Sequence, residues 1–142
     1  MIDKAMAETL INKALEVRKI SYSPYSGYQV GAALLTEGGS IYTGCNIENA
    51  AYSPTNCAER TAFFKAVSEG VRQFKAIAIV GGAKGEEITS YAYPCGVCRQ
   101  VMMEFCNPKD FDIIVAKSVN DYKVQTLEEL LPNGFGASNL GM

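Results

Sequence analysis

Two short apolar segments constrain the fold of this chain more than any other feature. Residues 76–80 (A-I-A-I-V) and 111–116 (F-D-I-I-V-A) are continuous apolar runs of strand length, and we predict that both are buried strands. Segments rich in helix-forming residues precede and follow them. Helices that alternate with apolar strands favour an α/β fold in which helices cover both faces of a sheet.

The other predicted elements complete the order α-β-β-α-β-α-β-β-α. Strands 28–35 and 41–47 flank the turn E-G-G-S and form a hairpin. Residues from Pro132 onward are expected to form a loose tail. A chain of 142 residues fits one domain, so we expect residues 1–142 to form a single domain. Helices are predicted over 3–20, 57–69, 95–106 and 126–131, with a last short strand at 124–126.

Composition excludes several classes of partner. The net charge is −2 and the Lys and Arg residues are scattered, so the basic stripe of a nucleic-acid-binding protein is missing. No apolar run approaches the roughly 20 residues that span a bilayer, and the N-terminus lacks a secretory signal. We therefore expect a cytoplasmic protein that acts on a small molecule, with neither nucleic acid nor membrane as a partner.

Five cysteines stand in a chain that has no histidine. Their odd number and the missing export signal argue against a disulfide framework. Cys95 and Cys98 form a C-x-x-C motif, and Cys57 begins another predicted helix. The exposed N–H groups and the dipole of a helix N-terminus stabilise thiolates there. Cys45 falls in a strand and Cys106 three turns along a helix, so both are expected to be core residues.

Three thiolates are one ligand too few for a closed structural zinc site. Three protein ligands plus an open position are typical of catalytic zinc, which lowers the pKa of a bound water to near 7. Glu59 follows Cys57 by two residues and can lean over such an open position as a proton carrier. Arg60 and Arg99 also follow ligands closely, and their guanidinium groups could hydrogen-bond sulfur and offset its charge.

Two readings from other classes use the same residues. A binding or scaffold protein with structural zinc would need a fourth ligand and would have no use for Glu59. A C-x-x-C oxidoreductase would leave both Cys57 and Glu59 unexplained.

The combination of C-A-E at 57–59 with P-C-G-V-C at 94–98 resembles the Cys₃ variant of the zinc deaminase signature. Over nearly its whole length the chain is similar to the small homotetrameric cytidine deaminases of the cytidine and deoxycytidylate deaminase superfamily. The matching segments are Y-S-P-Y-S (22–26), V-G-A-A-L (30–34), G-C-N-I-E-N-A-A-Y-S (44–53), N-C-A-E-R-T-A (56–62), P-C-G-V-C-R-Q (94–100) and E-E-L-L-P (128–132).

This resemblance implies a three-layer α/β/α sandwich around a five-stranded mixed sheet. It also implies one Zn²⁺ per subunit, held by Cys57, Cys95 and Cys98, and a homotetramer with active sites at the subunit junctions. The implied reaction is hydrolytic deamination of cytidine and 2′-deoxycytidine to the uridines and ammonia, a step of pyrimidine salvage. Zinc-bound hydroxide would attack C4 of the ring while Glu59 shuttles protons.

The resemblance further implies which residues bind the nucleoside. Asn46 and Glu48 match a pair that binds the ribose. Tyr28 falls where many relatives place Phe beside the nucleoside, and Tyr52 lies in a segment at the subunit junction. Phe135 matches an aromatic residue that packs over the base, usually delivered by another subunit.

Two related enzymes remain as rivals. A deaminase of another aminopyrimidine nucleoside, such as a blasticidin-type antibiotic, would share the zinc motif, but the close match of G-C-N-I-E-N favours cytidine. A deaminase of nucleic acid would need contacts to flanking phosphates, which the weak basic character disfavours.

Overall fold

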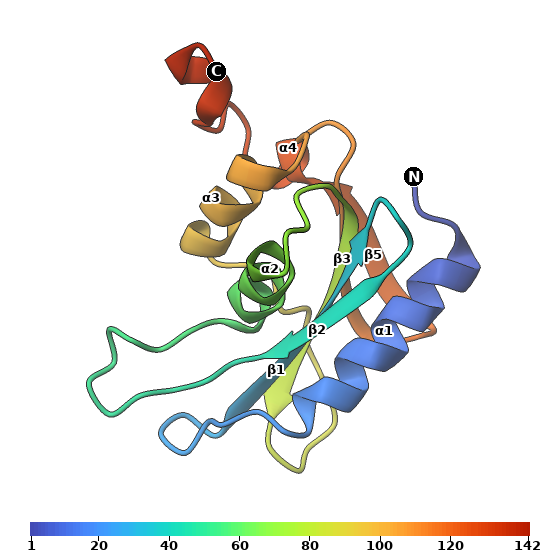
Figure 1. Ribbon diagram of the computed structural model, residues 1–142. Helices are drawn as coiled ribbons and strands as arrows, with labels where there is room; N and C mark the ends of the chain where they lie inside the picture. Colours follow the sequence, from blue (N-terminus) through green and yellow to red (C-terminus); the bar gives the residue numbers. More distant parts are fainter.

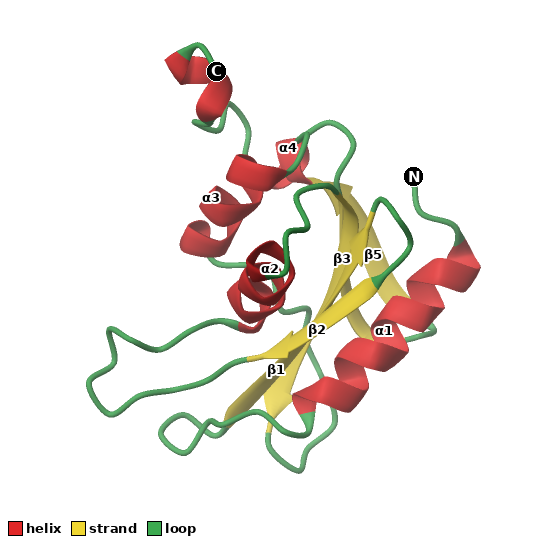
Figure 2. Ribbon diagram, in the orientation of Figure 1, coloured by secondary structure: helices red, strands yellow, loops and turns green.

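The computed structural model describes residues 1–142 and consists of one mixed sheet between two layers of helices (Figure 1 and Figure 2). The strands follow the spatial order β2-β1-β3-β4-β5. This confirms the three-layer α/β/α fold with five strands. The elements are α1 (Lys4–Arg18), β1 (Tyr28–Thr36), β2 (Ile41–Cys45), α2 (Ala58–Ser68), β3 (Phe74–Ala83), α3 (Gly96–Phe105), β4 (Asp112–Ser118), β5 (Asp121–Thr126), α4 (Leu127–Leu130) and the 3₁₀ helix η1 (Ala137–Leu140).

Strands β3 and β4 are the only parallel pair of the sheet. Parallel neighbours need a crossover connection, and here α3 supplies it. The segment 84–95 leads from the end of β3 to the start of α3, so it determines where the C-x-x-C motif lies. The hairpins β1–β2 and β4–β5 extend the sheet on either side with antiparallel pairs.

Alternation along the strands divides the core into two halves. In β3, Ile77 and Ile79 face α2 and α3, whereas Ala78 and Val80 face α1. The α1 side is filled mainly by aliphatic and Ala side chains. The opposite side holds a cluster of phenylalanines, in which the Phe63 and Phe74 rings meet edge to face at 5.0 Å. Both faces of the sheet are therefore buried, as the apolar runs predicted.

Strand β3 extends beyond the predicted residues 76–80. Gly81 and Gly82 resemble a turn in the sequence, but the strand continues through both. A Cβ at Gly81 would lie 2.9 Å from the Cβ of Ala92 and 3.0 Å from the ring of Tyr28. The glycine is therefore needed for the close approach of these two side chains and not for a turn.

Helix α2 begins in close contact with β2 at Gly44. A Cβ at Gly44 would lie 2.5 Å from the amide nitrogen of Ala62 and 2.6 Å from the carbonyl oxygen of Ala58. The helix backbone thus lies directly on the strand, and the small faces of Ala58 and Ala62 are fully buried there. This contact sets the height of the first turn of α2 above the sheet.

Two irregular segments project from this body. The loop between β2 and α2 and the C-terminal tail with η1 both extend away from the sheet (Figure 1). The tail is tied to α3 by a hydrogen bond from Gln100 Nε2 to the carbonyl oxygen of Phe135 (2.9 Å). The helices of the structure are all too short or too polar to cross a membrane.

The contact at Gly44 leads to a test of stability. Gly44→Ala forces a methyl group into the backbone of α2, so we expect the free energy of unfolding to fall by about 1–3 kcal/mol, as is typical of overpacking. Urea denaturation measures the change. Gly38→Ala is the control, because the nearest atom to a Cβ there is 3.8 Å away. An unchanged unfolding midpoint in Gly44→Ala would contradict the close approach.

Candidate active site

Three thiols meet at the N-termini of two helices. Cys57 is the N-cap of α2 and Cys95 is the N-cap of α3. Cys98 lies in the first turn of α3, and its backbone N–H donates to the Cys95 sulfur (3.5 Å). Cys95 thus caps α3 through sulfur as Ser or Asp commonly does through oxygen. Unpaired N–H groups and the helix dipoles therefore favour negative charge at this point.

The spacing of the three sulfurs matches that of sulfur ligands around a tetrahedrally coordinated metal. The Sγ atoms of Cys57 and Cys95 are 3.8 Å apart, those of Cys95 and Cys98 are 3.5 Å apart, and all three lie within 4.8 Å of one another. Sulfurs bound to zinc at about 2.3 Å in tetrahedral geometry are separated by about 3.8 Å. The three thiols therefore suit Zn²⁺ in both donor type and spacing, and they leave a fourth position open.

Arg60 provides the positive charge beside these sulfurs. Its Nη2 donates to the Cys57 sulfur (3.2 Å), while its Nε is buried with no acceptor. The neighbouring Cys98 thiol, and after it Arg60, lowers the pKa of Cys57 to about 5, despite the opposing effect of burial. The same pairing with Cys57, together with burial, raises the pKa of Cys98. Cys57 is therefore favoured as a thiolate over Cys98, and a bound metal would favour the thiolate form of Cys98 as well.

Arg99 lies differently from the sulfur contact that its position suggested. Its Nε donates to the carbonyl oxygen of Pro94 (2.8 Å) and its Nη1 to that of Leu130 (2.7 Å). The guanidinium group is directed to these carbonyls because α4 ends beside α3 and leaves the Leu130 carbonyl within reach. Arg99 therefore joins the backbone just before the C-x-x-C motif to the end of α4 and makes no hydrogen bond to sulfur.

Glu59 lies in the first turn of α2 and is only 4% exposed. Burial, and to a smaller extent the charge of Cys57, raises the pKa of Glu59 to about 7. Hydrogen bonding to its own backbone N–H and to Cys98 acts in the opposite direction. A carboxyl group with a pKa near 7 can both accept and release a proton under physiological conditions.

A small three-segment ladder joins the thiol cluster to the polar loops. Ile47 and Asn56 exchange backbone hydrogen bonds of 2.9 Å each. On its other side, Ile47 bridges Tyr22, because the Tyr22 N–H donates to the Asn46 carbonyl and the Glu48 N–H donates to the Tyr22 carbonyl. The residues that flank Ile47 are thereby held beside the residue that precedes Cys57.

Asn46 is one of these flanking residues, and its side chain is nearly saturated by the chain itself. Its Oδ1 accepts from the Val30 N–H (2.9 Å) and from the Ser21 hydroxyl, and its Nδ2 donates to the Tyr28 carbonyl (2.9 Å). An amide nitrogen carries two hydrogens. One N–H of Asn46 therefore remains for a ligand.

Glu48 flanks Ile47 on the other side and is half-buried. Its Oε1 accepts from the N–H groups of Tyr25 (3.0 Å) and Ser26 (3.1 Å), and its Oε2 accepts from the Ser26 hydroxyl. The Ser26 hydroxyl, followed by these N–H groups, holds the pKa of Glu48 below its usual value. Residues of the two loops enclose a hollow of about 400 Å³ lined by Tyr25, Ser26, Glu48, Asn49, Tyr52 and Thr55.

The three predicted aromatic residues occupy different surroundings. Tyr28 begins β1 and its ring lies over Gly81, next to Ala92 in the segment that leads to Cys95. Tyr52 is 75% exposed near the tip of the β2–α2 loop, in a left-handed backbone conformation (φ 62°) that is uncommon for a residue other than glycine. The side chain of Phe135 is exposed on the tail.

The remaining cysteines lie away from the cluster. Cys45 at the end of β2 points its sulfur toward the carbonyl of Ile20 (3.8 Å), and Cys106 is buried behind the end of α3. Burial raises the pKa of the Cys106 thiol. Neither is available as a fourth ligand, so the donor set stays at three.

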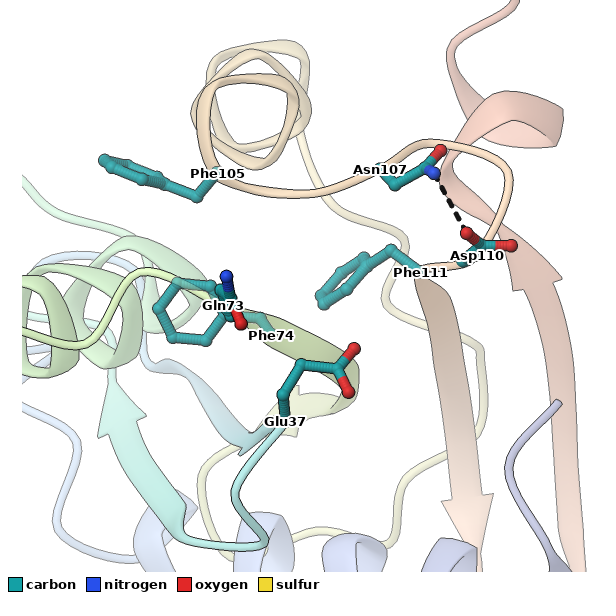
Figure 3. A pocket seen from close by; sticks show the side chains of 7 residues that line it. All are labelled: Glu37, Gln73, Phe74, Phe105, Asn107, Asp110 and Phe111. Atoms are coloured by element: carbon teal, nitrogen blue, oxygen red, sulfur yellow. Dashed lines mark hydrogen bonds between the residues drawn. The ribbon is translucent and has the colours of Figure 1, made fainter.

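A second hollow, of about 250 Å³, lies at the other ends of α2 and α3, away from the thiols (Figure 3). It contains no cysteine, and its Asp110 carboxylate accepts from the Asn107 side chain (2.9 Å). We assign no chemistry to it. Its lining consists of Glu37, Gln73, Phe74, Phe105, Asn107, Asp110 and Phe111.

Sequence reasoning missed two serines of the site. Ser21 donates to Asn46 and Ser26 donates to Glu48, so each fixes one member of the predicted sugar-binding pair. Both stand in the turn-forming stretch S-Y-S-P-Y-S, where serine is expected for local reasons alone. The only available signal was that Ser26 belongs to the matching segment Y-S-P-Y-S (22–26), which begins one residue after Ser21.

Comparison with known proteins first gives the class of the chain. Residues 4–113 match the family model described as the cytidine and deoxycytidylate deaminase zinc-binding region. The chain is 51% identical to the cytidine deaminase of Sporosarcina psychrophila, over 94% of this chain and 93% of that protein. It is 48% identical to the cytidine deaminase of Halalkalibacterium halodurans, over 94% of this chain and 96% of that protein.

Solved structures agree. The crystal structure of cytidine deaminase from Burkholderia pseudomallei is similar with a TM-score of 0.80 and 43% identity, over 89% of this chain and 97% of that one. The crystal structure of cytidine deaminase from Mycobacterium tuberculosis is similar with a TM-score of 0.77 and 35% identity, over 96% of this chain and 99% of that one. The fold and the thiol cluster thus define a member of the zinc-dependent deaminase superfamily. Within it, the chain belongs to the cytidine deaminase family.

The geometry of the thiols predicts how metal binding responds to substitution. Cys98→Ala removes the buried ligand, so we expect the purified protein to lose its stoichiometric zinc, measured by plasma mass spectrometry. Cys106→Ala is the matched control, because it removes a buried thiol of the same helix region without touching the cluster, and it should keep one zinc per chain. Full zinc content in Cys98→Ala would place the metal elsewhere.

Proposed function

We propose that the protein catalyses the zinc-dependent hydrolytic deamination of cytidine and 2′-deoxycytidine, which yields the corresponding uridine and ammonia. The observation that carries this proposal is the buried carboxyl group of Glu59 beside three clustered thiols with an open fourth position. A structural zinc site would need a fourth ligand and no buried acid. A dithiol oxidoreductase would need neither Cys57 nor Glu59.

Cys57, Cys95 and Cys98 would hold the metal, which when bound supplies a Lewis acid that makes water nucleophilic at neutral pH. Glu59 then accepts a proton from the attacking water and delivers it to N3 of the ring. After C4 has become tetrahedral, Glu59 takes the proton of the new C4 hydroxyl and passes it to the amino group, which leaves as ammonia while the C4 carbonyl forms. The pKa near 7 suits both directions of transfer, because neither protonation state of the carboxyl group is strongly preferred.

The sugar would be bound by the two groups that the loops leave free. Asn46 offers one N–H, and Glu48 retains one acceptor site on Oε2. A sugar hydroxyl can accept from the amide and donate to the carboxylate at the same time. This complementarity supports the assignment of Asn46 and Glu48 to the ribose, with Tyr28 beside the nucleoside.

We further propose that the chain, acting as one domain, assembles into a homotetramer in the cytoplasm. Large apolar side chains are exposed near the site, which is typical of surfaces that bind another chain. Tyr52 and Phe135 stand on projecting segments (Figure 1), so each can reach a neighbouring subunit. Five free cysteines fit a reducing compartment.

The role of Glu59 is tested by Glu59→Gln. We expect zinc to stay bound and turnover to fall by about 10²–10⁴-fold, the usual contribution of a proton-transferring group. The loss of cytidine absorbance, with uridine identified by chromatography, measures the rate. Glu69→Gln at the other end of α2 should behave as the unaltered protein. Normal turnover in zinc-loaded Glu59→Gln would contradict the assignment.

The shared site is tested by mixing subunits. Copies that carry Glu59→Gln lack the acid, and copies that carry Phe135→Ala lack the aromatic cover. When both are co-expressed and assemble together, some sites combine an intact Glu59 with an intact Phe135 from a neighbour. We therefore expect the mixture to contain sites with the KM of the unaltered protein. If every active site keeps the raised KM of Phe135→Ala, the cover comes from the same chain.

A further inference from the structure

Ser26 contacts Glu48 through two separate donors. Its backbone N–H donates to Oε1 (3.1 Å) and its hydroxyl donates to Oε2. The Tyr25 N–H also donates to Oε1 (3.0 Å), so one turn holds a carboxylate that comes from a different loop. We infer that Ser26 is a positioning residue, which fixes the orientation of the Glu48 carboxylate for a sugar hydroxyl. This inference rests on the proposed function.

The direction of the Ser26 hydroxyl is determined by its second partner. The Tyr28 N–H donates to Ser26 Oγ (3.0 Å), so the oxygen already accepts one hydrogen bond. An ionised carboxylate can only accept, and therefore the single hydroxyl hydrogen of Ser26 must point to Glu48. The start of β1 thus fixes the hydroxyl, and the hydroxyl fixes the carboxylate.

The remaining capacity of Glu48 shows what this arrangement leaves for a ligand. Oε1 accepts two N–H groups and is saturated, whereas Oε2 accepts only the Ser26 hydroxyl. One acceptor site remains, and its direction is set once Oε2 is engaged. Without the Ser26 hydroxyl only Oε1 stays bound, and because the terminal torsion of a glutamate is otherwise broad, the direction of the free site on Oε2 would be less tightly fixed.

The turn itself does not depend on the Ser26 hydroxyl. The Gly27 N–H donates to the Ser23 carbonyl (3.0 Å), and the Gly27 carbonyl accepts from the Lys84 N–H (2.8 Å). Gly27 also takes the left-handed conformation (φ 68°) that closes the turn. Ser26→Ala therefore removes the hydroxyl contact to Glu48 and the acceptor of the Tyr28 N–H, and leaves these backbone bonds of the turn in place.

The test compares two ligands that differ only in the sugar hydroxyls. Cytidine is assayed by its KM and kcat, and 2′,3′-dideoxycytidine by its Ki as a competitor. We expect Ser26→Ala to raise the KM for cytidine about 10-fold, the effect of one hydrogen bond to a charged group that is partly solvated, with kcat within 2-fold. The Ki of the dideoxy ligand should not change, because it lacks the 2′- and 3′-hydroxyls, which are the groups that we expect Glu48 to bind.

Three further variants separate the possible causes. Ser26→Thr keeps a hydroxyl and should restore the KM. Ser23→Ala alters the same turn without touching Glu48, and should leave the KM for cytidine and the Ki of the dideoxy ligand unchanged. Glu48→Gln should raise the KM for cytidine while sparing the dideoxy ligand.

Each contrary outcome has a distinct meaning. If Ser26→Ala weakens both ligands equally or neither, while Glu48→Gln weakens cytidine alone, then Ser26 does not position Glu48 and the sugar contact stands. If Glu48→Gln leaves the KM for cytidine unchanged, the proposed sugar contact fails, and the role of Ser26 fails with it.

Discussion

The whole site depends on keeping three sulfurs within 4.8 Å of one another in a chain without histidine. Three thiolates at this distance repel one another strongly in a partly buried place. Two features of the fold reduce this repulsion: two helix N-termini meet at the cluster, and the Arg60 guanidinium donates to the Cys57 sulfur. Zinc removes the rest of the repulsion, since a bound cation deprotonates its thiol ligands and offsets their charge.

This meeting of helix ends is produced by backbone packing as much as by the cysteines. Gly44 lets the first turn of α2 lie on β2, and Arg99 joins the Pro94 carbonyl before α3 to the Leu130 carbonyl of α4. The cluster is therefore largely preformed, and the binding energy of the metal is not spent on moving the helices.

Residue chemistry and helix starts were sufficient to predict the three metal ligands and Glu59 as a group, because C-x-x-C and C-x-E are local patterns. Four of the five strands also followed from local patterns, whereas β5 begins at Asp121, three residues before the predicted strand 124–126, in a largely polar segment. What local pattern could not supply were contacts between distant segments. The sequence around Gly81 resembles a turn, and only the packing of Tyr28 and Ala92 against it explains the glycine. One partner of Arg99 lies 31 residues away, and Ser26 contacts Glu48, which lies 22 residues further along the chain.

Two glutamates of the site have pKa values that their environments shift in opposite directions, although their side chains are identical. Glu59 is buried, so its charged form is poorly solvated and its pKa rises to about 7. Glu48 is only half-buried and receives three hydrogen bonds from one turn, which lower its pKa. A carboxyl group whose pKa is close to the surrounding pH can exchange a proton. A carboxyl group whose pKa lies far below the pH stays ionised and only accepts hydrogen bonds. The fold thus places a buried carboxyl group beside the three thiols, where we propose that it carries protons, and an ionised acceptor in the outer loops, and the Ile47 ladder joins the two regions.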